Sequence, residues 1–315
     1  MNKTNEVKVF DCTIRDGGLV NNFHFNDDFV KGVYNTCVKA GIDYMEIGKN
    51  NSPTLMSEEE FGAWNFCKEE DIRRIVGNNN TDLKIAVMSD IGRTVNSELL
   101  DKKDSVVDMI RIATYIHQID EAIILANQAH DKGYETTINI MAVAKVQEDE
   151  LNNALEKLSK TKVDVIYIAD TFGSYFPDQI KELSLKYTSV ASKVGKQVGI
   201  HAHNNIQLAF ANTIEAKNNG VTFLDVTISG LGRGAGNCAM ELLIGYLDNP
   251  KYKLTPVLDF IENHIVKLEK ELDWGYSIPY MIAGQLIQHP RDAMKARDEK
   301  DTKYLDFYKK SLESN

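Results

Sequence analysis

The chain has 315 residues, of which 43% are hydrophobic and 26% are charged, and its formal net charge is −10 at pH 7. This size and composition are typical of one enzyme domain with a sizeable core, and they argue against general disorder. The acidic balance disfavours nucleic acid or an anionic membrane as a partner, because both require a basic surface.

The cellular compartment is indicated by what the sequence lacks. No run reaches the roughly 18 apolar residues that a membrane span requires, and residues 1–8 lack the apolar centre of a signal peptide. The four cysteines stand far apart without C-x-x-C spacing, which argues against a disulfide framework or a zinc knuckle. We therefore expect a cytoplasmic protein.

Apolar runs typical of strands alternate with helical patterns along most of the chain. The predicted strands are 7–10, 42–48, 83–88, 109–113, 136–143, 163–169, 197–201 and 223–228. The predicted helices are 27–39, 119–132, 148–160, 177–194 and 206–218, with at most a short helix over 95–103. Eight alternations predict an α/β fold, either a closed (β/α)8 TIM barrel or an open doubly wound sheet.

Polar residues at or near the strand ends favour the barrel. They come from the whole chain and are Asp16, Glu46, Asn139, Asp170, His201, His203 and Thr227. Only a closed barrel brings the C-terminal ends of all strands around one mouth, where barrel enzymes hold their catalytic groups. We expect a TIM-barrel catalytic domain over residues 1–250.

The pattern changes after residue 250. One long helix is predicted over 255–272 and further helices over 278–310, without any strand. Residues 251–315 are therefore expected to form a helical extension that covers the barrel or makes a dimer contact.

The first motif is the adjacent pair Arg15 and Asp16, which follows an apolar strand and precedes Gly17 and Gly18. Adjacent charges at a strand end, followed by residues free to take positive φ, indicate groups presented at the barrel rim. We expect Asp16 to bind a metal and Arg15 to bind negative charge on a substrate.

The second motif places His201 and His203 two residues apart at the end of a strand, so both side chains face the same side. Two imidazoles and the carboxylate of Asp16 make a facial ligand set for a divalent cation. The alternative is that both histidines are only hydrogen-bonded rim residues.

The third motif is the glycine-rich stretch 229–237, directly after the eighth strand. A dinucleotide-binding loop needs the first strand of a βαβ unit and an acidic partner further on, so we reject NAD binding. Asn237 can supply an amide oxygen to the metal or to a ligating water.

Together these motifs resemble the DRE-TIM metallolyases, the family of HMG-CoA-lyase-like enzymes and pyruvate aldolases. The matching positions are 11–17, Glu46, Asp170, 201–204, 234–237 and Glu241, which cover essentially the whole predicted barrel. The resemblance implies that Asp16, His201 and His203 bind Mn, Mg, Co or Zn, that Asn237 is a further ligand or supports one, and that Arg15 steadies an enolate oxygen.

Within that family the sequence is most similar to 4-hydroxy-2-oxovalerate aldolase-like proteins. Those aldolases carry a histidine two residues after the Arg-Asp-Gly motif as a base, and this chain has Leu19 there. His24, Tyr276 and Tyr280 are the candidates to replace it, although the tyrosines can also be packing residues. His289 is expected to be structural or interfacial, with the mouth of the barrel as the alternative.

The expected activity is that of a divalent-metal-dependent aldolase or lyase acting through a 2-oxo acid enolate. Its small-molecule partners would be a 2-oxo acid and an aldehyde, and it would work as a homodimer or higher homo-oligomer. Glu46 is expected to orient Arg15 or a histidine, or to transfer a proton. Asn139, Asp170 and Thr171 are expected to contact substrate.

Three other functions stay open at this point. They are a Claisen-type acyltransferase condensing acetyl-CoA with a 2-oxo acid, a metal-dependent hydrolase of amidohydrolase type, and a non-catalytic subunit that kept the fold. The hydrolase is disfavoured because that superfamily carries its H-x-H motif on the first barrel strand, whereas His201 and His203 follow the seventh. Leu19 motivates the non-catalytic subunit.

Overall fold

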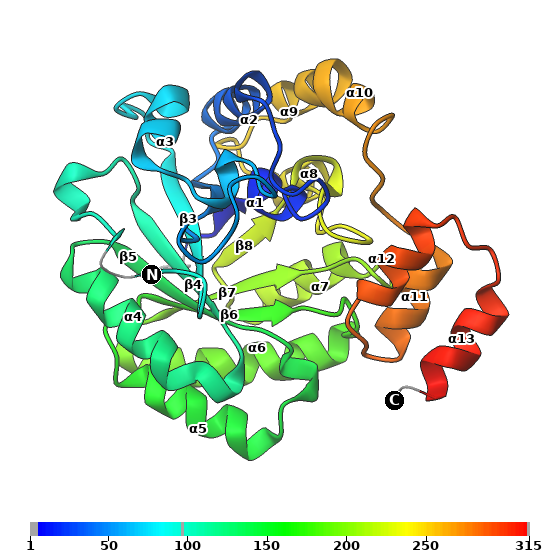
Figure 1. Ribbon diagram of the computed structural model, residues 1–315. Helices are drawn as coiled ribbons and strands as arrows, with labels where there is room; N and C mark the ends of the chain where they lie inside the picture. The colour runs from blue at the N-terminus through cyan, green and yellow to red at the C-terminus, as the bar shows by residue number, and fades with distance from the viewer. Residues whose placement is uncertain (1–5, 96–97, 314–315) are drawn as a thin grey trace.

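The computed structural model describes residues 6–95 and 98–313 (Figure 1). Their strands form a closed parallel barrel in chain order, with β1 paired to both β2 and β8. The strands are β1 Lys8–Asp11, β2 Tyr44–Lys49, β3 Lys84–Asp90, β4 Met109–Thr114, β5 Glu135–Ile140, β6 Val165–Asp170, β7 Gln197–Ala202 and β8 Phe223–Val226. The predicted TIM barrel is confirmed.

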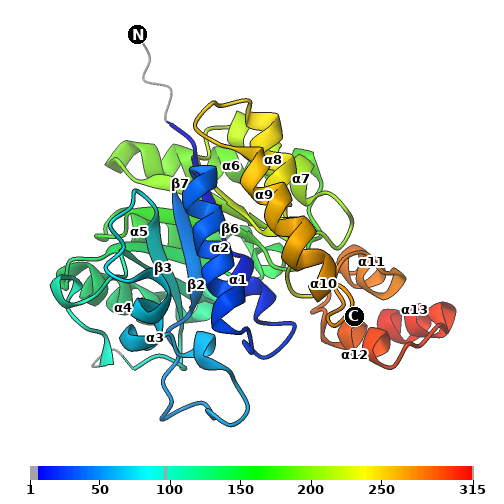
Figure 2. The same ribbon diagram turned by 90° about the horizontal axis from the view of Figure 1, so that it is seen from above.

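Helices surround the barrel (Figures 1 and 2). They are α1 Thr13–Gly17, α2 Asp27–Ala40, α3 Glu69–Val76, α4 Ile119–Asp131, α5 Glu148–Ser159, α6 Pro177–Ala191, α7 Ala209–Asn218 and α8 Met240–Leu247. The sequence does not predict α1, α3 or α8, because α1 and α3 are short and α8 is apolar on most sides. Part of the short helix predicted over 95–103 lies outside the described residues, which have a 3₁₀ turn at Lys102–Asp104.

The helix predicted over 255–272 is shorter and is interrupted. It consists of α9 Leu254–Phe260, a π-helical turn Ile261–Ile265 and α10 Val266–Leu268. The wider π turn lets Phe260 and Ile265, five residues apart, both be buried. Phe260 packs on Phe29 of α2 with ring centroids 5.4 Å apart, so this helix belongs to the layer around the barrel.

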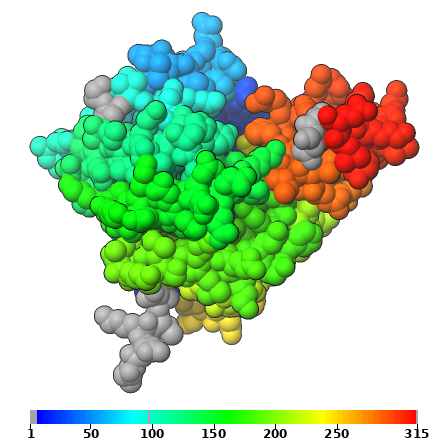
Figure 3. Space-filling view, turned by 90° about the horizontal axis from the view of Figure 1, so that it is seen from below, coloured from blue at the N-terminus to red at the C-terminus, as the bar shows by residue number. Residues whose placement is uncertain are grey.

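The last helices are α11 Ile278–Gln285, α12 Arg291–Asp298 and α13 Tyr304–Glu313. They form a group on one side of the barrel, which projects from it in the space-filling view (Figure 3). Tyr280, Ala283 and Ala293 pack on Ala235 of the glycine-rich loop after β8, which joins the group to the barrel. The domain boundary at residue 250 stays a prediction.

The described part of the chain contains no helix that is long and apolar enough to span a membrane. Its apolar residues form a large cluster between the strands and the helices, and a smaller one that includes Phe10, Tyr44, Tyr167 and Phe223. Four aromatic side chains thus pack together beneath the mouth of the barrel.

Gly199 of β7 leaves the space that the Tyr167 ring occupies. A Cβ atom at residue 199 would lie 2.4 Å from Cζ of Tyr167, whose ring is fully buried. We therefore expect Gly199→Ala to lower the free energy of unfolding by roughly 1–3 kcal/mol in urea titrations, since an overpacked core must shift.

The matched control is Gly245→Ala in α8, where the added Cβ would meet no atom within 4 Å. Alanine is the better helix former, so this variant should be unchanged or more stable by up to about 1 kcal/mol. Equal stability of the two variants would contradict the packing role of Gly199.

Candidate active site

Arg15 and Asp16 lie on α1, a buried helical turn that begins after β1 has ended at Asp11. Thr13 fixes this turn, because its Oγ1 donates to Oδ1 of Asp11 at 2.5 Å and accepts the Ile228 N–H at 2.9 Å. The charged pair therefore lies near the end of the strand, as predicted, but on a helical turn that follows it.

The two glycines after this pair are needed for space and not for positive φ. Gly18 has a φ of −59°, and Gly17 is the last residue of α1. A Cβ atom would lie 2.9 Å from Leu231 at residue 17, and 2.2 Å from the Phe23 ring at residue 18. Both glycines let neighbouring side chains approach the turn closely.

Asp16, His201 and His203 come together as a candidate metal-binding group. Oδ2 of Asp16 lies 2.9 Å from Nε2 of His201 and 3.9 Å from Nε2 of His203. His201 belongs to β7 and His203 follows it directly, and all three side chains are buried. A carboxylate and two imidazoles are a ligand set that suits Mn, Fe, Co or Zn.

The protonation of this group suits a cation. Burial opposes ionisation of Asp16, but Arg15 and the two histidines outweigh it and hold the pKa of its carboxyl well below the usual range. Burial lowers the pKa of His203 to about 3, so its imidazole is neutral at pH 7. Metal ions bind carboxylates and neutral imidazoles, which are the forms of Asp16 and His203.

Asn237 lies beside this group and has an unused oxygen. Its Oδ1 is buried and accepts no hydrogen bond from residues 6–95 or 98–313. The side chain lies beside Asp16, because a Cβ atom at Gly232 would be 2.0 Å from Nδ2 of Asn237 and 3.2 Å from Oδ1 of Asp16. A buried, unused amide oxygen at this place fits a divalent cation or a water bound to one.

The guanidinium of Arg15 connects the candidate metal group to Glu46. Nε donates to Oε2 of Glu46 at 2.6 Å, and Nη1 donates to Oδ2 of Asp16 at 2.9 Å. Nη2 lies 3.4 Å from Nε2 of His201 and so faces the same space as the metal group. Arg15 can therefore donate a hydrogen bond to an oxygen bound there.

Arg111 and Asp225 lie beneath this layer. The fully buried guanidinium of Arg111 donates to Oε2 of Glu46 at 3.0 Å and to Oδ2 of Asp225 at 2.6 Å. Asp225 in turn accepts the Nδ1 proton of His201 at 2.9 Å. Burial and Arg15 lower the pKa of His201, but the hydrogen bonds of His201 to Asp16 and Asp225 outweigh them and raise it.

These contacts close a ring of six side chains in which carboxylates alternate with Arg15, Arg111 and His201. In order they are Asp16, Arg15, Glu46, Arg111, Asp225 and His201, which returns to Asp16. The sequence analysis missed Arg111 and Asp225. The sequence does contain a signal for them, because each is the single charged residue in a mainly apolar strand, β4 or β8.

A pocket of about 490 Å³ opens beside this ring. Arg15, His201 and His203 line it, as do Asn139, Thr171 and Leu19. Asp170 is not among its lining residues and is buried, where Oδ1 accepts the Ser174 N–H at 3.0 Å and burial raises the pKa of the carboxyl to about 7. Asp170 thus supports the loop after β6.

Known proteins with similar sequences and structures identify the family. A model of the HMGL-like family matches residues 6–265. The chain belongs to the HMGL-like family. It is 30% identical to an oxaloacetate decarboxylase of Mycobacterium tuberculosis over 264 residues, which cover 81% of this chain and 74% of the relative.

Two further similarities agree with this HMGL-like assignment. A 4-hydroxy-2-oxovalerate aldolase of Bacillus cereus is 25% identical over 253 residues, covering 80% of this chain and 73% of the relative. The solved N-terminal domain of a provisionally named aldolase from Bacteroides vulgatus superposes with a TM-score of 0.80 at 32% identity, covering 92% of this chain and 96% of that one. The predicted membership of this family of carbon–carbon lyases is confirmed.

Three residues considered as a base in this HMGL-like protein do not line the pocket. His24 is exposed, with Nε2 3.1 Å from the carbonyl oxygen of Glu60. Tyr276 is 48% exposed, and Tyr280 is buried with its ring 5.3 Å from the guanidinium of Arg297. The titratable side chains that do line the pocket, besides those of the ring, include Tyr115, His117 and His289.

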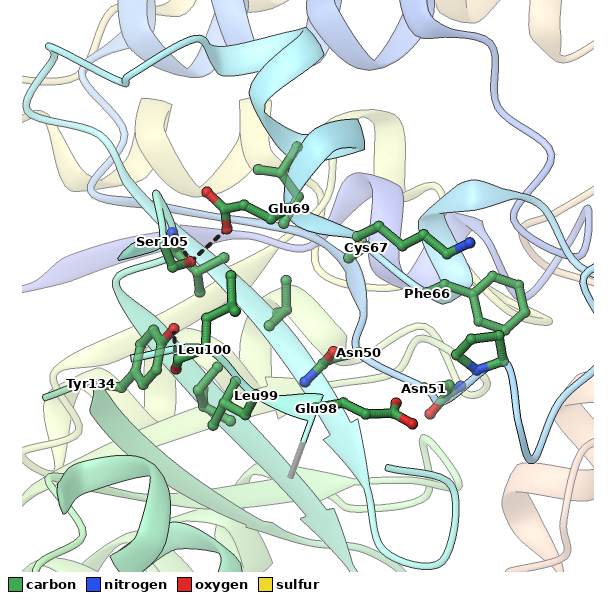
Figure 4. Close-up of a pocket in the computed structure, with 16 residues that line it drawn as sticks. Asn50, Asn51, Phe66, Cys67, Glu69, Glu98, Leu99, Leu100, Ser105 and Tyr134 are labelled. Atoms are coloured by element: carbon green, nitrogen blue, oxygen red, sulfur yellow. Dashed lines mark hydrogen bonds between the residues drawn. The ribbon is translucent and has the colours of Figure 1, made fainter. Parts of the chain in front are cut away.

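A second cavity, of about 200 Å³, contains none of the predicted site residues (Figure 4). Its polar groups bond to one another: Oγ of Ser105 donates to Oε2 of Glu69 at 2.7 Å, and the hydroxyl of Tyr134 donates to the Leu100 carbonyl at 3.0 Å. This cavity lies between β3, β4 and α3, and the side chains of Ser105, Glu69 and Tyr134 in it already have partners.

Replacing Arg111 tests the ring of six side chains. Arg111→Met leaves Glu46 and Asp225 buried without their shared cation, so we expect the free energy of unfolding to fall by roughly 3–5 kcal/mol in urea titrations. Lys157→Met, which removes a surface ion pair with Asp120, is the control and should cost less than about 1 kcal/mol. Similar losses in both variants would refute the ring's role in stability.

Proposed function

We propose that this protein is a divalent-metal-dependent lyase that makes or breaks a carbon–carbon bond through the enolate of a 2-oxo acid, in the manner of a 4-hydroxy-2-oxoacid aldolase. The observation that carries the proposal is the group of Asp16, His201 and His203, with Nη2 of Arg15 facing the same space. The aldolase and decarboxylase relatives support it.

The metal would be held by Asp16, His201 and His203, with Asn237 as a further ligand or as the partner of a ligating water. We propose that the ion is Mn, Mg, Co or Zn. Mn, Co and Zn accept imidazole nitrogen together with carboxylate oxygen, and Mg favours oxygen ligands and water. When bound, such an ion draws electron density from the oxygens of a 2-oxo acid as a Lewis acid.

The residues of the chain supply the rest of the chemistry. Arg15 donates through Nη2 to the oxygen on which negative charge develops, and this donor is positioned before the reaction begins. Glu46 is fully buried and bonded to Arg15 and Arg111, so we assign it as a positioning residue. Asn139 and Thr171 line the pocket and are proposed to orient the substrate's hydroxyl group.

In the cleavage direction a 4-hydroxy-2-oxo acid gives its hydroxyl proton to water in the pocket, the bond between C3 and C4 breaks, and C3 of the enolate then takes up a proton from water. The bonding electron pair passes into the enolate, and the former hydroxyl carbon leaves as an aldehyde. Condensation is the reverse. Both directions need the same oxygen stabilisation by Arg15.

A second candidate is decarboxylation of a 2-oxo dicarboxylic acid, favoured by the similarity to the Mycobacterium tuberculosis oxaloacetate decarboxylase. There the bond between C3 and C4 also breaks and leaves the same enolate, but the departing group is CO₂. The two reactions differ only in what leaves, so one site serves either.

The protein is also proposed to act in the cytoplasm as a homodimer or higher homo-oligomer. The four cysteines are buried and free, which suits a reducing compartment. Leu305 and Leu312 of α13 are 65% and 48% exposed, which suits contact with a second copy. Light scattering of the full chain that gives a monomer mass would contradict the oligomer.

The proposed function predicts that the metal-loaded protein exchanges the methyl protons of pyruvate with deuterium, because enolate formation is reversible. It should also release pyruvate from 4-hydroxy-2-oxo acids or from oxaloacetate, which nuclear magnetic resonance detects in the same sample. Exhaustive chelation should abolish these reactions. Consumption of acetyl-CoA with a 2-oxo acid, in place of these reactions, would identify a Claisen-type acyltransferase instead.

Variants separate metal binding from turnover. Asp16→Ala and His203→Ala should lose both the bound metal and the activity, as measured by elemental analysis and by pyruvate release. Arg15→Lys should keep the metal but lower kcat by about 100-fold or more, since a lysine cannot bond to Glu46, Asp16 and substrate in one plane. Full activity of Arg15→Lys would refute the role of its guanidinium.

A further inference from the structure

One wall of the pocket carries cationic side chains that have no anionic partner. Arg233 and Arg291 line the pocket, and neither forms an ion pair with any residue that the structure describes. The other wall differs, because Lys49 and Arg93 lie 2.5 and 3.6 Å from Oδ2 of Asp90. Lys49 and Arg93 thus share one carboxylate, whereas Arg233 and Arg291 have none, in a chain whose net charge is −10.

Arg233 lies next to the candidate metal group. Its backbone N–H donates to Oδ1 of Asp16 at 3.1 Å, while Nη2 reaches only the carbonyl of Thr171 at 3.5 Å. Nε is buried and has no hydrogen-bond partner within the described ranges. Arg233 as a whole is half-buried, but a buried Nε without an acceptor is costly, so its place at the pocket indicates a ligand that supplies the missing acceptor.

Arg291 is the first residue of α12, and His289 lies two residues before it in the connection from α11. The Arg291 N–H donates to Nδ1 of His289 at 3.2 Å, so the proton of the neutral ring is on Nε2. Burial and the two arginines lower the pKa of His289 to about 4, which keeps the ring neutral at pH 7. His289 thus offers an N–H donor beside two cations.

We propose that Arg233, His289 and Arg291 bind an anionic group, a phosphate or a carboxylate, at the far end of the aldehyde substrate. This inference rests on the proposed function and names the class of its second substrate. Two guanidinium groups and an imidazole N–H supply the charge-assisted donors that such an oxyanion requires. The site gives a preference for aldehydes that carry a negative charge.

The anionic group bound by these residues is one that is not lost in the reaction, unlike the carboxylate that leaves in a decarboxylation. Donors that hold a carboxylate destined to leave as CO₂ would stabilise the reactant more than the transition state, which slows the reaction. Holding a remote anion stabilises both states and positions the aldehyde carbon against the enolate. The cationic wall therefore favours aldol chemistry over decarboxylation.

The test compares aldehydes that differ in charge. Metal-loaded protein is given pyruvate with propionaldehyde, glycolaldehyde phosphate or succinic semialdehyde, and kcat/KM is measured for each. We expect an anionic aldehyde to be preferred by about 10- to 100-fold, the range of a charged hydrogen bond. The phosphate and carboxylate arms tell which anion is bound, and equal use of all three aldehydes would overturn the proposal.

Variants assign the preference to these residues. Arg233→Gln and Arg291→Gln should each reduce the ratio of anionic to neutral aldehyde use by about tenfold, because each removes one charged donor. Arg93→Gln is the matched control, since Arg93 lines the same pocket but is paired with Asp90, and it should keep the ratio. A ratio that all three variants retain would contradict the assignment.

Binding of inorganic phosphate separates this inference from the proposed function. Calorimetry on the metal-loaded protein should show binding that weakens about tenfold in Arg233→Gln and in Arg291→Gln but not in Arg93→Gln. This measurement needs no turnover, so it decides the anion site even if pyruvate exchanges no protons and the proposed function fails. No binding, or equal binding in all variants, would overturn the anion site.

Discussion

The closed ring of Asp16, Arg15, Glu46, Arg111, Asp225 and His201 is the constraint on which the rest of the site depends. Removing a charge from water costs several kcal/mol per ion, as an order of magnitude, and a single partner rarely offsets it. Closure gives every member two partners of opposite or complementary charge. The ring therefore fixes where Asp16 and His201 lie before any ligand arrives.

Aromatic side chains hold Arg111, a fully buried member of the ring. The guanidinium of Arg111 lies 4.3 Å from the Phe10 ring and 4.4 Å from the Tyr167 ring, one on β1 and the other on β6. Tyr167 in turn fits over Gly199, two residues before His201 on β7. The geometry of the candidate metal group thus depends on side-chain volumes in the barrel interior as well as on its own polar contacts.

The barrel and the group of Asp16, His201 and His203 were predictable, because strand and helix periodicity is local and these residue types are specific for metal chemistry. Arg111 and Asp225 were not, since one charge in an apolar strand has no distinguishing spacing. His24, Tyr276 and Tyr280 were candidates to replace the histidine that Leu19 displaces, but whether a side chain reaches the pocket depends on the tertiary fold, which the sequence does not show. His289 reaches the pocket because α11 and α12 pack on the glycine-rich loop.

The glycine-rich loop after β8 separates the part of the chain that holds the buried charges from the part that lines the outer pocket. The ring belongs entirely to the barrel and α1, whereas His289 lies between α11 and α12 and Arg291 begins α12, in a group of helices that meets the barrel through Ala235. Substitutions in the outer helices can therefore alter what enters the pocket and leave the buried charges in place. Such a separation lets descendants of one ancestral enzyme acquire new substrates while inheriting a single bond-making step.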